Sequence, residues 1–226
     1  SDYSQEEDHA ESGSGYEIKR NGFTVDGAKF SERMKSEFLN PQNKFRTTAL
    51  YEKRGPEPSV YNADIEFSKD NVINEWKKGY GLISWWAHGN STSAAGKVWK
   101  ADTNNDSIAQ MSEKEWEDFA YSGFPDSSYN PDKPAFTSQV SCLNSRPDRS
   151  NNLSYTLLSK GGAITSMGAT SVTLYSPAWS YPNQNRMDNV SFGYYYTRNI
   201  SKNYPAGKAL VLTRAMSSSL TWQDGS

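Results

Sequence analysis

Apolar residues recur every three or four positions in some segments of the chain and form short continuous runs in others. The first spacing predicts helices, and apolar runs bounded by glycine or proline predict buried strands. We expect helices over residues 28–38, 68–78, 112–121, 154–160, 188–202 and 207–217. We expect strands over residues 16–25, 47–51, 82–87, 134–141 and 163–167. Strands that alternate with helices predict an α/β domain built from parallel βαβ units.

Local signals support two of these elements. Ser68 is suited to the N-cap of the helix at 68–78, and Gly79 follows that helix as a stop signal. The run at residues 82–87 is almost continuously apolar and is bounded by glycines. Such a run is typical of a strand that is buried on both faces of a parallel sheet.

Composition limits the classes of function. The 226 residues carry a net charge of -2 and 13% aromatic residues, and the pI is about 5.8. This charge indicates no nucleic-acid partner, and no apolar run reaches the roughly 20 residues that cross a bilayer. The aromatic-rich composition favours a loop-rich, secreted protein. Residues 1–15 are acidic and rich in Gly and Ser, which predicts a flexible tail before a domain over residues 16–226.

Cysteine and histidine are scarce. Cys142 is the one cysteine, and the two histidines are His9, which lies in the acidic tail, and His88. His88 follows the predicted strand at 82–87, and Cys142 follows the one at 134–141. Because carboxyl ends of parallel strands line a crevice, both side chains are expected at the functional edge of the sheet. A packing cysteine and a structural histidine are the alternative interpretation.

A thiol and an imidazole at one edge can carry out acyl transfer. The thiolate is the nucleophile, and the imidazole takes the thiol proton and passes it to the leaving amine. The backbone N–H of Gly89, which has no side chain to hinder approach, is a candidate donor to the oxyanion.

Three segments resemble the gingipain family of caspase-like (clan CD) cysteine peptidases. A glycine and an apolar strand lead to His-Gly at residues 79–90, and a second apolar strand leads to Cys at 140–144. A Gly-Gly-Ala-Ile strand follows at 161–170. The resemblance implies a caspase-like three-layer α/β sandwich with a mostly parallel central sheet. It also implies a cysteine endopeptidase that cleaves polypeptides, with basic residues at P1 as one possible preference.

The resemblance assigns roles to particular residues. His88 becomes the acid–base group, Gly89 an oxyanion donor and Cys142 the nucleophile. The S1 pocket, which holds the side chain before the cut, would be formed by Trp86, Val140, Ser141 and, from the loop at 170–179, Trp179. Trp86 is bulky for a pocket that accepts a long basic side chain, and no acidic selector can be placed. Because about 87 residues precede His88, we expect an upstream chain or subdomain from processing to complete the sheet.

One loop has the spacing of a calcium site. Oxygen-bearing side chains stand at positions 1, 3, 5 and 12 of a loop, namely Asp102, Asn104, Asp106 and Glu113. Ser107 replaces the usual glycine, and the alternative is a surface turn that caps the next helix. Structural calcium is the one cofactor expected, with no redox or organic cofactor. Zinc is excluded because one Cys and two distant His cannot form a site.

Two further functions stay open at this point. The chain could be a catalytically silent caspase-like domain used for binding or regulation. It could also be a cysteine-dependent transpeptidase, because transfer and hydrolysis share an acyl-enzyme and differ only in the acceptor. The presence of both His88 and Cys142 favours an enzyme.

Overall fold

A three-stranded parallel sheet lies at the centre of the computed structural model, which describes residues 27–41, 45–56, 58–107, 110–173 and 188–218. Its strands are β3 (Leu82–Trp86), β7 (Ala135–Val140) and β8 (Ala163–Met167), in the order β3-β7-β8. The register pairs Leu82 with Phe136 and Trp86 with Val140. The strands predicted at 82–87, 134–141 and 163–167, and their parallel arrangement, are confirmed.

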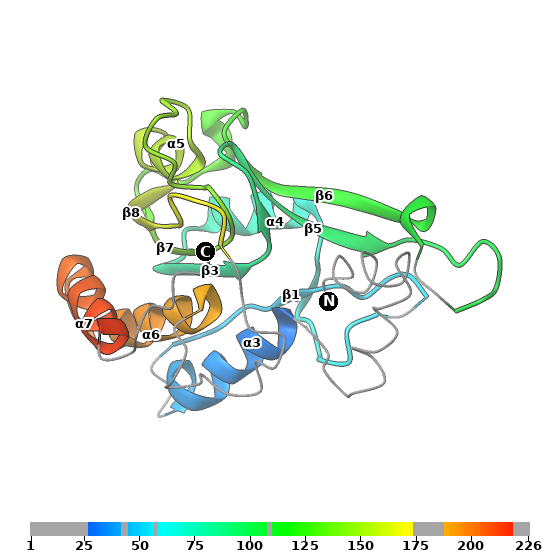
Figure 1. Cartoon of the computed structure of the whole chain (residues 1–226), viewed down its shortest axis with the longest axis horizontal. Coiled ribbons are helices and arrows are strands. Elements are labelled where there is room, and N and C mark those ends of the chain that lie inside the picture. Colours follow the sequence, from blue (N-terminus) through cyan, green and yellow to red (C-terminus); the bar gives the residue numbers. More distant parts are fainter. Residues whose placement is uncertain (1–26, 42–44, 57, 108–109, 174–187, 219–226) are drawn as a thin grey trace.

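Helices cover both faces of this sheet (Figure 1). One face carries α4 (Lys69–Lys78) and α5 (Leu153–Ser159). The opposite face carries α3 (Gly27–Met34), α6 (Asn189–Ser201) and α7 (Ala206–Ser218). The helices predicted at these positions are confirmed, and α3 continues as a π-helical turn over Lys35–Leu39. The protein is therefore an α/β sandwich of three layers.

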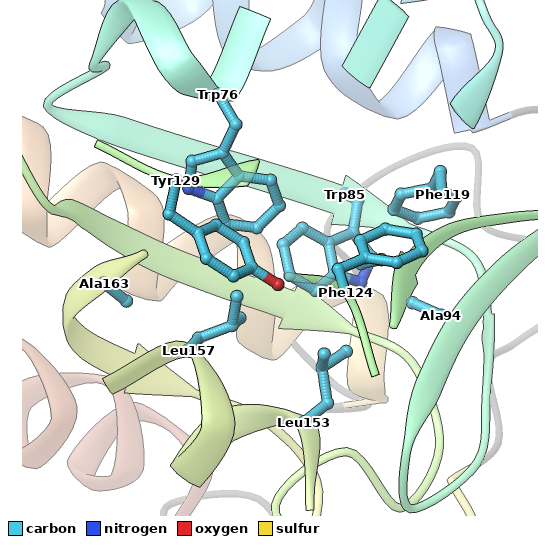
Figure 2. Packing of buried hydrophobic residues seen from close by; sticks show 10 residues of the cluster. Trp76, Trp85, Ala94, Phe119, Phe124, Tyr129, Leu153, Leu157 and Ala163 are labelled. Carbon is cyan, nitrogen blue, oxygen red and sulfur yellow. The ribbon is translucent and has the colours of Figure 1, made fainter. Parts of the chain in front are cut away.

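The alternation of side chains along β3 explains the two cores. Leu82 and Trp86 face α3, α6 and α7, whereas Ile83 and Trp85 face α4 and α5. On the second face, the ring of Phe119 packs edge to face with Trp85, and that of Tyr129 packs edge to face with Trp76; Figure 2 shows these buried rings. The apolar run at 82–87 thus has a buried partner on each side, as its sequence predicted.

A second, antiparallel sheet extends beside the first (Figure 1). Its strands are β4 (His88–Gly89), β5 (Ser93–Trp99) and β6 (Lys114–Tyr121). The helix predicted at 112–121 is therefore wrong, because residues 114–121 form a strand that pairs with β5, which the sequence analysis missed. A 3₁₀ turn over Met111–Glu113 precedes β6.

A β-bulge explains why β6 resembled a helix. The pairing steps from Ala95–Asp118 to Ala94–Ala120, which leaves Phe119 as the extra residue. Phe119 and Ala120 are consequently both buried, and the strict alternation of a strand is lost. With Trp116, these apolar positions mimic the three-to-four spacing of a helix.

Smaller elements complete the described structure. β1 (Leu50–Tyr51) pairs in parallel with β2 (Ile65–Glu66). Of the strand predicted at 47–51, only the last two residues form a strand. A short 3₁₀ turn spans Asp126–Ser128. The tail predicted at 1–15 and the strand predicted at 16–25 lie outside the described residues.

Candidate active site

The neighbouring strands β3 and β7 both end at the candidate site. The backbone N–H of Ala87 donates to the carbonyl of Val140 at 3.0 Å, which extends their pairing to the strand ends. His88 lies two residues beyond the end of β3, and Cys142 lies two residues beyond the end of β7. The sheet thus brings the two sequence segments together at one edge, as the motif spacing predicted.

Gly89 is the point of closest approach between these segments. A Cβ atom placed on Gly89 would lie 2.4 Å from the carbonyl oxygen of Cys142 and 2.9 Å from the Cβ of Ser141. It would also lie 3.0 Å from Nδ2 of Asn144. Real Cβ atoms do not make contacts below about 3.0 Å, so only glycine lets the His88 segment lie against the Cys142 loop in this way.

The thiol of Cys142 is half-buried and faces the segment that follows β8. Its Sγ lies 3.5 Å from both the backbone N–H and the carbonyl of Thr173, and 3.6 Å from the Thr173 hydroxyl. Asn189, the first residue of α6, donates to that hydroxyl at 2.8 Å. Sequence reasoning assigned the loop at 170–179 to this side of the site but did not single out Thr173.

The imidazole of His88 packs against the ring of Trp116 on β6. The ring centroids are 5.1 Å apart, and the planes meet at 87°, which is an edge-to-face contact. Lys97 on β5 places its ammonium 4.8 Å from the same indole ring. Trp116 is half exposed, and through this residue the β5–β6 hairpin contacts His88. Trp116 was missed because its segment was predicted to be helical. The sequence signal for the hairpin lies on the partner strand β5, where Val98 and Trp99 are residues that favour strands.

The comparison with protein families decides the class of this site. The sequence model of Peptidase family C25 matches residues 6–224 of the 226-residue chain. The chain belongs to peptidase family C25. No protein of curated function and no solved structure matches it significantly.

Membership of family C25, the gingipain family of clan CD, confirms the resemblance seen in the motifs. This C25 protein is a cysteine peptidase, and its substrate class is polypeptide. Helices on both faces of a mostly parallel sheet agree with the expected caspase-like fold. None of the helices in the described ranges is long and apolar enough to cross a membrane.

Three of the residues expected to form the S1 pocket of the C25 peptidase, namely Trp86, Val140 and Ser141, lie in the described part of the chain. Val140 is fully buried, and Ser141 is 1% exposed. Trp86 packs edge-on against Phe30 of α3, with centroids 6.1 Å apart. As placed here, Val140 and Ser141 can reach a substrate only through their backbone. Trp179 lies outside the described residues, and the pocket assignment stays a prediction.

The acidic loop is held together by its own hydrogen bonds. Asp102 accepts from the backbone N–H groups of Asp106 and Ser107, and Asn104 accepts from that of Asp106. Across the loop, the carboxylate of Glu113 accepts from the N–H and hydroxyl of Thr103 at 2.5 and 2.7 Å. The hydrogen bonds from the Thr103 side chain and backbone lower the pKa of Glu113 to about 2.

These contacts leave the carboxylates facing N–H and O–H donors. Within the described residues, no group of three or more His, Cys, Asp or Glu is placed to hold a metal ion. A calcium ion would require the oxygens of these side chains to turn toward one point. Calcium binding by Asp102, Asn104, Asp106 and Glu113 stays a prediction.

Proposed function

We propose that this C25 peptidase is an endopeptidase that hydrolyses peptide bonds with Cys142 as nucleophile and His88 as acid–base group. The observation that carries the proposal is the contact at Gly89, where the backbone of the His88 segment lies against the carbonyl of Cys142. The sequence contains one cysteine, and His88 follows the strand that pairs with the strand before Cys142, which supports His88 as its partner.

The reaction proceeds in two steps that share one intermediate. His88 accepts the thiol proton, and the sulfur of Cys142 attacks the carbonyl carbon of the scissile bond. The C–N bond breaks, the proton passes from His88 to the leaving amine, and a thioester remains on Cys142. Water, deprotonated by His88, then attacks the thioester, which releases the new carboxyl terminus and restores the thiol.

The negative charge that develops on the carbonyl oxygen needs fixed donors. The backbone N–H of Gly89 is our candidate, because this residue directly follows His88. Its support is the close packing of Gly89 against the carbonyl of Cys142, which brings the His88 segment next to the loop of the nucleophile. Oxyanion donors that are already in place avoid reorganisation during the reaction.

Two finer features rest on the family alone. Cleavage after a basic P1 residue and action outside the cell are both proposals from the likeness to gingipains. A fluorogenic library with each amino acid at P1 tests the first. If activity is absent with Arg and Lys but present with another residue, the basic preference is refuted and the peptidase assignment is kept.

The dyad is tested with Cys142→Ala, His88→Ala and His9→Ala, the last being the matched control at the other histidine. We expect cleavage to be lost in the first two variants and kept in the third. A peptide chloromethyl ketone is expected to label only chains with an intact Cys142. Cleavage that persists in Cys142→Ala would refute the proposal, and products joined to an added amine nucleophile would show transpeptidation instead.

A further inference from the structure

Asn144 is completely buried two residues after the nucleophile, and its side chain spans the two halves of the site. Its Nδ2 donates to the carbonyl of Asn90 at 2.7 Å and to that of Ser93 at 2.8 Å. Its Oδ1 accepts a hydrogen bond from the hydroxyl of Ser141. From sequence, Asn144 could equally have capped the next helix or touched substrate, whereas the structure shows a bridge between the Cys142 loop and the turn after His88.

The hydrogen-bonding capacity of this amide is well used. A primary amide offers two N–H donors and one carbonyl acceptor, and Asn144 places both donors and the acceptor on partners. The chain of contacts continues inward, because the indole N–H of Trp85 donates to the same Ser141 hydroxyl at 3.2 Å. Trp85 belongs to β3, so this series of hydrogen bonds begins on the strand that precedes His88 and ends at the turn that follows it.

The turn that receives these bonds is the link between β4 and β5. Within it, Asn90 donates from its backbone to the Ser93 carbonyl at 3.0 Å. A third carbonyl of the same turn, that of Ser91, accepts from the backbone N–H of Leu153 at 2.8 Å. The carbonyls of residues 90, 91 and 93 thus each accept a hydrogen bond from a residue that follows Cys142 in the chain. The side chain of Asn144 supplies two of these three bonds, and the backbone of Leu153 supplies the other.

We propose that Asn144 is a positioning residue of this peptidase, which holds the turn after His88 to the loop of Cys142. The proposal rests on the proposed function, since it concerns the alignment of that dyad. An amide is required at this place: aspartate cannot donate to two carbonyls, and leucine can neither donate nor accept. Loss of the bridge frees the turn after His88 from the Cys142 loop, and misplacement by about 1 Å is enough to slow a reaction by about 100-fold.

The test compares Asn144→Asp and Asn144→Leu with the unsubstituted chain. We expect kcat to fall by about 100-fold with little change in KM, because the bridge aligns reacting groups and touches no substrate. A second readout needs no substrate: the rate of Cys142 alkylation by iodoacetamide as a function of pH. In both variants this profile is expected to move toward that of His88→Ala, which a loss of global stability alone would not cause.

The matched control is Asn199, which is also buried and donates to the Thr213 hydroxyl at 3.2 Å between α6 and α7. Asn199→Leu is expected to lower the melting temperature while leaving kcat and the alkylation profile unchanged. If an Asn144 variant does not fold, Ser141→Ala removes the donor to Oδ1 together with the acceptor of the Trp85 indole, keeps both Nδ2 bonds and is expected to shift both readouts in the same direction.

The outcomes separate the two proposals. Folded Asn144 variants with the kcat and alkylation profile of the unsubstituted chain would refute the positioning role and leave the dyad intact. An alkylation rate that does not depend on His88 in the unsubstituted chain would refute the dyad itself, and with it the reason for the bridge.

Discussion

Replacing Gly89 with alanine tests the close approach on which the proposed site depends. The added Cβ would lie 2.4 Å from the carbonyl oxygen of Cys142, whereas ordinary contacts begin near 3.4 Å. The two backbones must therefore separate by about 1 Å, and the loop cannot yield easily because Ser141 and Asn144 are also in the way. Alanine keeps the backbone N–H, so the expected loss of about 100-fold in kcat/KM comes from displacement alone.

The assay is kcat/KM on a fluorogenic peptide, together with the free energy of unfolding in urea. We expect Gly89→Ala to lose about 1–3 kcal/mol of stability as well, the usual range for overpacking. Gly81→Ala is the matched control, because a Cβ at Gly81 meets nothing within 4 Å. Its kcat/KM is expected to match that of the unsubstituted chain. If Gly89→Ala performs as well as Gly81→Ala, the contact does not hold the site and the reasoning fails.

Three further predictions follow from individual contacts. An added Cβ on Gly193 of α6 would lie 2.1 Å from the buried valine that ends β7, so Gly193→Ala is expected to cost about 1–3 kcal/mol in urea unfolding. Gly207→Ala in α7, which meets nothing within 4 Å, should be neutral or stabilising, and equal effects would contradict the packing argument. Trp116→Ala is expected to lower kcat/KM by up to about 10-fold, and Trp116→Phe by less, because an aromatic pair with His88 contributes about 0.5–1.5 kcal/mol. The pKa of Glu113 is lowered to about 2 in the fold, so its contribution to stability is present above about pH 5 and is lost as the pH falls toward 2. Unfolding free energies of the unsubstituted chain and Glu113→Gln should therefore converge over that range, and a constant difference would refute this prediction.

Local sequence patterns were sufficient to predict most helices and strands of the central sandwich. The helix at α4 begins after Ser68, whose side chain accepts from the backbone of Asn71, and ends at Gly79 with a φ of 78°. Both features are properties of single residues and their immediate neighbours. The strands β3, β7 and β8 could be predicted from short segments that begin and end with apolar residues, although β7 also buries the polar side chains of Thr137, Ser138 and Gln139.

The antiparallel hairpin could not be predicted in the same way. The segment at 112–121 contains residues compatible with a helix, and its strand conformation depends on pairing with β5, which precedes it by about fifteen residues. The bulge at Phe119 further hides the alternation that would have marked a strand. Since Trp116 belongs to this hairpin, its contact with His88 was missed for the same reason.

The sequence by itself was enough to predict the family and the central α/β sandwich and to propose the two reactive residues, because motif order, cap residues and apolar runs are local features of the chain. Only the tertiary structure decided how those residues are held. The close approach at Gly89, the bridge made by Asn144 and the ring of Trp116 beside His88 join segments that lie between 28 and 54 positions apart. Contacts of this kind depend on how strands and loops pack in three dimensions, and no local pattern of residue types records them.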